Sequence, residues 1–110
     1  MPIKKRHQVI SLGTVDGNSV EVDASSADWA IVMVKNGGSS NTVGVEASPQ
    51  PFGESPTWYD VGVGITVTAS QNWAWPIPGY GYSQQYAPGR MRITTSESAE
   101  VWVELVREIE

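Results

Sequence analysis

The sequence predicts an all-β fold, an antiparallel β-sandwich of the jelly-roll or Ig-like type with seven to eight short strands and one long aromatic loop. Apolar residues recur at every second position through most of the 110 residues, and no segment has the spacing of an amphipathic helix. Runs of Gly, Asn, Asp, Ser and Pro separate the alternating segments, as turns separate strands. Short antiparallel strands without helices pack as a sandwich or a barrel.

The chain is predicted to begin with a hairpin. Residues 7–15 alternate as a first strand, and residues 19–23 form the return strand. The connection Asp16-Gly17-Asn18 supplies residues that tolerate positive φ, which a tight hairpin turn requires.

Four more strands are predicted in the next part of the chain. Residues 29–35 are almost continuously apolar, which favours a central strand that is covered on both faces. Residues 42–47 alternate cleanly between apolar and polar. After a long turn rich in Pro, Gly and Ser, residues 58–61 resume extended structure, and residues 65–70 form a strand with one apolar face and one hydroxyl face.

The region from residue 72 to residue 89 breaks the alternating pattern. It combines prolines and glycines with five aromatic residues, so we predict a long ordered excursion without regular secondary structure. Residues 90–95 and 100–105 then close the domain as two strands around the turn of residues 96–98. Residues 106–110 either fray or continue the last strand.

The distribution of charge divides the chain into a basic N-terminal arm, residues 1–7, and a single β-sandwich domain, residues 8–110. The net charge is −5, but Lys4, Lys5, Arg6 and His7 stand together near the start. Four adjacent potential cations are poor folding material. We expect either a solvated, disordered arm or a tether to an acidic surface or a neighbouring subunit. Nucleic acid is the weakest alternative, because the other cations suggest no groove.

Composition also bounds the compartment and the available chemistry. The absence of cysteine excludes a disulfide framework and thiolate metal sites. The basic start leads into an alternating segment and not into a long apolar run, so we expect neither a signal peptide nor a membrane span.

Candidate catalytic and metal-binding residues are few, and each fits a plainer role better. His7 lies where nothing would orient it as a general base. Glu46 and Asp60 could face each other on neighbouring strands as glycosidase carboxylates do, but exposed sheet faces show such pairs routinely. The loop of residues 23–28 lacks the spacing and the glycine of a calcium-binding loop. We predict no catalytic residue, no cofactor and no metal, and therefore no enzyme.

Aromatic residues gather in the least charged part of the chain. Residues 36–89 contain no Lys, Arg or His and only three acids, yet they hold eight of the ten aromatic residues. Tyr and Trp supply large contact areas at low side-chain entropy cost, so this segment predicts contact with a partner. The alternative is that Trp73, Trp75 and their neighbours form a small core beneath the excursion. Trp29 begins an apolar strand and is predicted to lie in the core.

A further tryptophan is predicted to face outward near the C-terminus. If Val101 and Val103 face the core, Trp102 points the other way and needs cover from the excursion or from another subunit. The predicted contact residues are Lys4, Lys5, Arg6, Trp73, Trp75, Tyr80, Tyr82, Tyr86 and Trp102.

Two passages resemble a known class of proteins. The first is Val43-Gly-Val-Glu-Ala-Ser-Pro, which leads through a turn to Trp58-Tyr-Asp-Val-Gly. The second is Arg90-Met-Arg-Ile-Thr-Thr, followed by Val101-Trp-Val-Glu-Leu. This order is similar to that of small β-sandwich virion proteins of tailed bacteriophages, and it covers residues 42–70 and 88–106.

The resemblance implies a capsid decoration or cement protein that is made in the host cytoplasm and ends on the capsid surface of the virion. Its partner would be the major capsid protein or another virion protein, and it would form a homo-oligomer, with a trimer favoured. The alternatives are a tail, neck or fibre-attachment protein of the virion, or a carbohydrate-binding module that stacks aromatic side chains on sugar rings. A glycan partner is the less favoured one.

Overall fold

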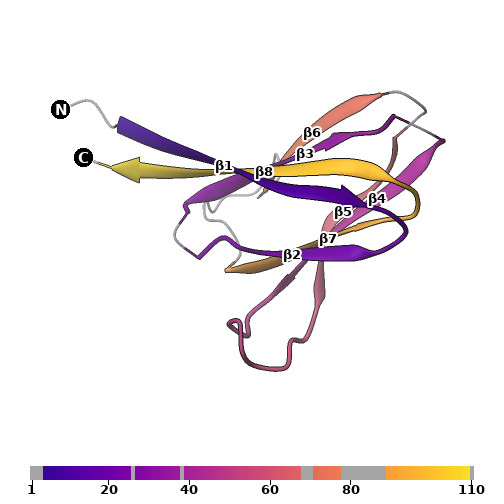
Figure 1. The fold of residues 1–110 in the computed structure, drawn as a ribbon. Helices are drawn as coiled ribbons and strands as arrows, with labels where there is room; N and C mark the ends of the chain where they lie inside the picture. The colour runs from indigo at the N-terminus through magenta and orange to yellow at the C-terminus, as the bar shows by residue number, and fades with distance from the viewer. Residues whose placement is uncertain (1–3, 26, 38, 68–70, 78–88, 110) are drawn as a thin grey trace.

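The computed structural model describes residues 4–25, 27–37, 39–67, 71–77 and 89–109, which form two four-stranded antiparallel sheets packed face to face (Figure 1). This arrangement confirms the predicted β-sandwich. None of these residues lies in a helix, so the described part of the chain holds no helix long and apolar enough to span a membrane. The strands are β1 (Lys4–Val15), β2 (Ser19–Asp23), β3 (Trp29–Lys35), β4 (Asn41–Ser48), β5 (Tyr59–Val67), β6 (Asn72–Ile77), β7 (Arg90–Thr95) and β8 (Ala99–Ile109).

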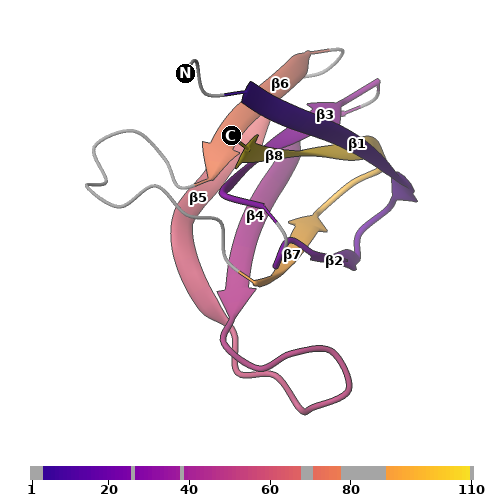
Figure 2. The same cartoon turned by 90° about the vertical axis from the view of Figure 1, so that its left-hand side faces the viewer.

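The order of the strands shows that most connections cross from one sheet to the other. One sheet has the order β1-β8-β3-β6 and the other has the order β2-β7-β4-β5, so β4 and β5 are the one pair of consecutive strands that share a sheet. Figure 2 shows β5 and β6 together along one side of the sandwich. The first and last strands of the chain are neighbours, as are its second and seventh strands.

The predicted hairpin of the first two strands is therefore wrong, although the turn chemistry is as expected. Gly17 has a φ of 58°, in the left-handed region that glycine adopts readily. The turn nevertheless sends the chain into the opposite sheet. The amide of Thr95 donates to the carbonyl oxygen of Asn18 at 2.9 Å, which ties the turn to the end of β7. Turn chemistry sets the reversal but not the partner strand.

β6 lies inside the region that was predicted to have no regular structure, and residues 72–77 correct that prediction. The strand contains Pro76, which has no amide hydrogen to donate to a sheet ladder. β6 is an edge strand with β3 as its neighbour, so an edge position accommodates the proline. Residues 78–88 of the same region lie outside the described residues.

The core lies between the two sheets and is rich in valine. Val101 and Val103 of β8 are fully buried, as are Val32 of β3 and Val43 and Val45 of β4. Because side chains alternate along a strand, Trp102 lies on the outer face of its sheet, as the sequence predicted.

The N-terminal cations do not form a separate arm. β1 begins at Lys4 and pairs with β8 as far as Ile109, so the expected disordered arm is wrong for residues 4–7. Figure 1 shows the two strands leaving the sandwich together at one end of the molecule. We call residues 4–6 and 107–109, which pair with each other beyond the end of β3, the terminal ribbon. These charged residues can form a strand because Lys5, Arg6 and His7 remain exposed to solvent.

Asn41 at the start of β4 holds the turn between β7 and β8. Its side chain is fully buried. Its Nδ2 donates to the carbonyl oxygens of Glu97 at 2.7 Å and Ser98 at 3.3 Å. Its Oδ1 accepts from the amides of Ser96 at 3.0 Å and Glu97 at 3.1 Å. The side-chain amide of Asn41 thus satisfies four backbone groups of the turn between β7 and β8.

Replacing Asn41 with Ala is expected to lower the free energy of unfolding by about 2–3 kcal/mol, because several hydrogen bonds of a buried group are lost at once. Urea unfolding followed by tryptophan fluorescence measures the change. Asn72→Ala on the exposed part of β6 is the matched control, and its effect should stay within about 0.5 kcal/mol. Equal effects of the two substitutions would contradict the role of Asn41.

Candidate functional site

The outer face of the β1-β8-β3-β6 sheet carries a group of large apolar side chains. The core-facing residues of β3 are buried, so Trp29, Ile31 and Met33 point to the outer face, where each is half-buried. Trp102 of β8 is the register partner of Met33. Val9 of β1, which is 61% exposed, lies in the same row as Ile31, with Glu104 of β8 between the two. We call the five apolar residues the apolar outer face.

A shallow groove of about 370 Å³ crosses one side of this face. Met33 and Trp102 line it together with Asn72 and Ala74 of the edge strand β6, and Lys35 stands at its end. Val34 and Trp73 complete the lining, so the groove combines aromatic residues with polar groups. Such a surface suits a protein side chain or a sugar ring.

Charged side chains border the apolar outer face on the β1 side. The Lys5 ammonium lies 5.1 Å from the centroid of the Trp29 ring, within the range of a cation–π interaction. His7 Nδ1 contacts the carboxylate of Glu104, which stands between Val9 and Ile31 on β8. Apolar side chains with polar groups beside them are common in protein contact surfaces.

The outer face of the opposite sheet carries a second aromatic cluster, which is built around two arginines of β7. The guanidinium of Arg92 lies 4.5 Å from the centroid of Trp58. The guanidinium of Arg90 lies 4.6 Å from the centroid of Phe52 and 5.5 Å from that of Trp58. Phe52 and Trp58 belong to the long β4–β5 connection, and these contacts attach them to the sheet. Figure 1 shows the connection extending from the sandwich.

Hydrogen bonds complete this cluster. Arg90 Nε donates to Glu21 Oε1 at 2.7 Å, and its Nη1 donates to the carbonyl oxygens of Pro51 at 3.1 Å and Glu54 at 3.0 Å. Arg92 Nε donates to Glu46 Oε1 at 2.9 Å. Both arginines are thus occupied in holding the connection, and the cluster is structural.

The acidic candidates of the sequence also have local partners. Glu46 and Asp60 are register partners on β4 and β5, as considered for a glycosidase pair, but Glu46 is bonded to Arg92. In the loop after β2, hydrogen bonds from the Ser25 side chain and then from its amide lower the pKa of Asp23 below its usual value. Within the described ranges, no three His, Asp or Glu side chains are grouped so that they could hold a metal ion.

The predicted contact residues are spread over different parts of the fold. Trp73 and Trp75 are the register partners of Val34 and Val32, so they lie on the core-facing side of β6. Their rings stack at 5.5 Å with an interplanar angle of 2° and pack against the core while remaining partly exposed. We therefore leave these two tryptophans out of the apolar outer face. Tyr80, Tyr82 and Tyr86 lie outside the described residues.

The remaining predictions are divided between the ribbon and the sheet. Lys4, Lys5 and Arg6 belong to β1, and Trp102 lies beside Met33 in the apolar outer face. Trp29 was predicted to lie in the core, and its half-exposed outward position corrects that prediction.

Sequence reasoning missed Ile31, Met33 and Val9 as members of this surface. The signal for two of them was present, because β3 is apolar at both odd and even positions and so has two apolar faces. The sequence predicted cover on both faces. In the part of the chain that the structure describes, the two sheets place no further layer over the outer face of β3.

Comparison with solved structures shows where this fold recurs. A chain of the T13 viral particle of infectious bursal disease virus superposes with a TM-score of 0.52 at 11% sequence identity. That match covers 94% of this chain but 31% of the viral chain, so this chain spans about a third of that protein's length. At such identity, the similarity shows the fold alone.

Two smaller proteins match over most of both chains with lower scores. The SPBc2 prophage-derived protein YomS has a TM-score of 0.48 and 10% identity, with 96% of each chain covered. The CBM22-1 xylan-binding domain of Xyn10C from Paenibacillus barcinonensis has a TM-score of 0.45 and 12% identity, with 98% of this chain and 86% of that domain covered. No protein-family model matches the sequence, and no curated protein matches it.

Replacing Arg90 with Met should release the β4–β5 connection while leaving the sheets paired. We expect a loss of about 2–3 kcal/mol in unfolding free energy, because three hydrogen bonds to a charged group disappear. Chymotrypsin should also cleave faster after Phe52. Mass spectrometry of timed digests measures this, with Lys35→Met on an exposed strand end as the control. Unchanged cleavage in the Arg90 variant would show that the cluster does not hold the connection.

Proposed function

We propose that this chain is a non-enzymatic structural protein of a phage virion, and that it serves there as a capsid decoration or cement protein. The apolar outer face carries the proposal. Two tryptophans, a methionine, an isoleucine and a valine gather on one side of a sheet and remain partly or largely exposed. A gathered apolar surface with a polar rim is typical of a protein contact site.

The size of the face indicates what it can do alone. Four strands spaced by about 4.8 Å and seven residues rising about 3.3 Å each give roughly 440 Å² of projected area. A stable contact buries about 800 Å² on each partner. The face therefore suits one part of a larger attachment, such as that of a protein held at several points on a particle surface.

Two further observations support a virion role. The passages around Trp58 and Arg90 resemble small virion proteins of tailed bacteriophages, and the sandwich fold recurs in a viral particle. In this proposal, the partner is the major capsid protein or another virion protein, the protein forms a homo-oligomer with a trimer favoured, and it resides on the capsid surface. A tail, neck or fibre-attachment position uses the same contact surface.

Carbohydrate binding is the second candidate, and the groove beside Trp102 favours it. A sugar ring stacks on an aromatic face while nearby polar groups bind its hydroxyls. Trp102 offers the face, and Asn72 and Lys35 offer the polar groups. The two candidates differ in the partner that the same surface would bind.

Placing a charge in the apolar outer face separates a contact surface from an ordinary solvent face. Met33→Glu should leave the sandwich folded but weaken binding to capsids of the source particle about 30-fold or more, since desolvating an unpaired carboxylate in a contact opposes binding. Cosedimentation with purified capsids measures the affinity, and circular dichroism confirms the fold.

Thr66→Glu places the same charge on the exposed surface of the opposite sheet and is the matched control. It should bind capsids as the unmodified chain does. Capsid binding that withstands Met33→Glu would rule out attachment through this face. A reproducible glycan-array signal that is lost in Trp102→Ala, together with no capsid binding, would instead establish the carbohydrate-binding role.

A further inference from the structure

Two arginines face each other across the terminal ribbon. Arg6 of β1 and Arg107 of β8 are register partners, so their side chains leave the ribbon on the same face, and both are exposed. They line a small hollow of about 130 Å³ together with Gln8, Ala27 and Leu105. Like charges directly opposite each other on paired strands repel and weaken the pairing.

Neither guanidinium is neutralised by an acid within the described part of the chain. The ion pairs found there lie elsewhere, and none involves Arg6 or Arg107. A guanidinium presents five N–H donors in a planar fork, which matches the two oxygens of a carboxylate. Two adjacent forks therefore fit a partner that brings clustered carboxylates, and such a partner would also relieve the repulsion between the arginines.

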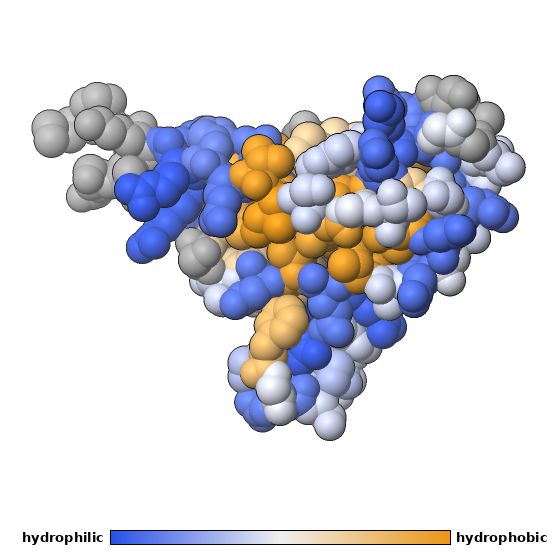
Figure 3. All heavy atoms as spheres, in the orientation of Figure 1, coloured by the Kyte–Doolittle hydropathy of each residue, from blue (hydrophilic) through white to orange (hydrophobic). Residues whose placement is uncertain are grey.

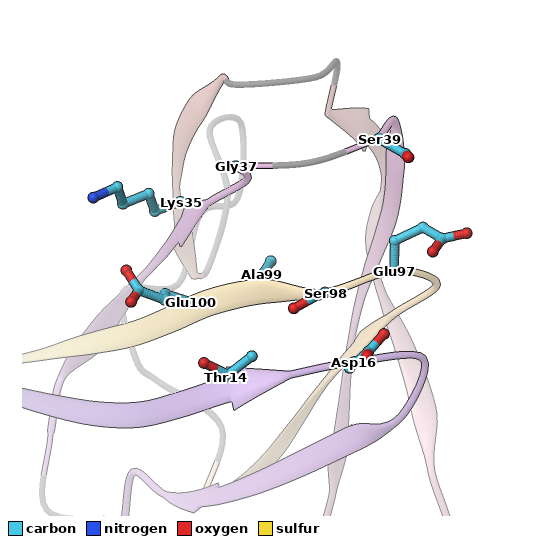
Figure 4. A pocket seen from close by; sticks show the side chains of 9 residues that line it. All are labelled: Thr14, Asp16, Lys35, Gly37, Ser39, Glu97, Ser98, Ala99 and Glu100. Carbon is cyan, nitrogen blue, oxygen red and sulfur yellow. The ribbon is translucent and has the colours of Figure 1, made fainter.

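The opposite end of the molecule carries clustered carboxylates beside an open hollow of about 600 Å³ (Figure 4). Asp16 stands on the turn after β1 and Glu97 on the turn after β7, and Glu100 follows at the start of β8. Lys35 is the one basic side chain of the lining. Asn41 holds the turn that bears Glu97, so the backbone at this acid is fixed.

The arginine pair and the acidic hollow cannot meet within one molecule. Figure 1 shows the terminal ribbon leaving the sandwich at one end, with the turns from β1 to β2 and from β7 to β8 at the other end. A contact between the two features must therefore join different copies. Because it joins unlike surfaces, it is a heterologous contact, which closes into a ring or continues as a filament.

We propose that Arg6 and Arg107 of one copy bind the carboxylates of Asp16 and Glu97 of a second copy, so that copies join head to tail. Complementary charge identifies the partner as a second copy. The ribbon presents two adjacent arginines, and the hollow at the other end of the same chain presents the acids. The inference deepens the proposed function and rests on its expected homo-oligomer. It supplies the second contact that the limited area of the apolar outer face calls for.

A charge-swap mixing experiment on the full chain tests this contact. One variant carries Arg6→Glu and Arg107→Glu, and the other carries Asp16→Lys and Glu97→Lys. In sedimentation velocity at about 0.1 M salt, each variant alone should self-associate at least about tenfold more weakly than the unmodified chain. An equal mixture should recover association. The acidic ribbon of the first variant then meets the basic hollow of the second, and the basic ribbon of the second meets the acidic hollow of the first.

Several controls separate this contact from general effects of charge and folding. Single Arg6→Gln should weaken association, whereas Thr66→Glu, which changes the net charge by the same amount but lies on the exposed surface of the opposite sheet, should leave it within about twofold. Association of the unmodified chain should fall in 1 M salt, where the screening length is about 3 Å. If charge reversal in the turns prevents folding, Asp16→Asn with Glu97→Gln provides a neutral test that should still weaken association.

Three outcomes overturn the inference: a mixture of folded variants that stays monomeric, an unmodified chain that is monomeric at both salt concentrations, or equal effects of Arg6→Gln and Thr66→Glu. Failure of the proposed function looks different. If the chain assembles in a salt-sensitive way but never binds capsids, the virion role fails and the head-to-tail contact stands. If it binds capsids through the Met33-sensitive face while remaining monomeric, the head-to-tail contact fails and the virion role stands.

Discussion

The pairing of the first strand with the last is the constraint on which the rest of the structure depends. β1 and β8 run together from Lys4 opposite Ile109 to Val15 opposite Ala99. This pairing makes β8 an inner strand between β1 and β3, and it encloses Val101 and Val103 in the core. Joining residues so distant in sequence costs loop entropy, so the apolar burial along β8 must offset that cost.

The same pairing creates both surfaces to which we assign contacts. Along the sandwich, it sets Val9 in the row of Glu104 and Ile31 and so extends the apolar outer face to β1. Beyond the sandwich, the two strands continue as a ribbon and bring Arg6 opposite Arg107. A shorter β1 would leave the core intact but remove the ribbon, so in our proposal the extra length serves contact with a second copy. A bulge between Ser11 and Gly13, where Gly13 has a φ of 74°, lies within the part of β1 that packs on the sandwich.

Polar side chains take the place of the short hairpin turns that this topology lacks. Asn41 satisfies the backbone of the β7–β8 turn, and Arg90 holds the carbonyl groups of the β4–β5 connection. Both side chains are buried or nearly so, and each joins segments that are far apart in sequence. Such fixed connections give the Glu97 end of the molecule a defined shape.

The sequence by itself determined the fold class, most of the strands and the outward position of Trp102. It could do so because alternation of apolar and polar residues follows directly from strand geometry. The same reasoning misplaced Trp29, because a strand that is apolar on both faces predicts cover whether or not a second layer exists. It also missed β6, since Pro76 excludes a central strand but not an edge strand, and edge positions are assigned only when the sheet is assembled.

Only the tertiary structure decided which strands are neighbours, and with them the candidate contact surfaces. The turn at Gly17 has the conformation that its residues favour, yet β1 pairs with β8 and β2 with β7. A turn sets the reversal of the chain locally, whereas the choice of partner depends on burial summed over both whole strands. For the same reason, the pairing of Arg6 with Arg107 cannot be read from the sequence, because nothing local to either residue refers to the other.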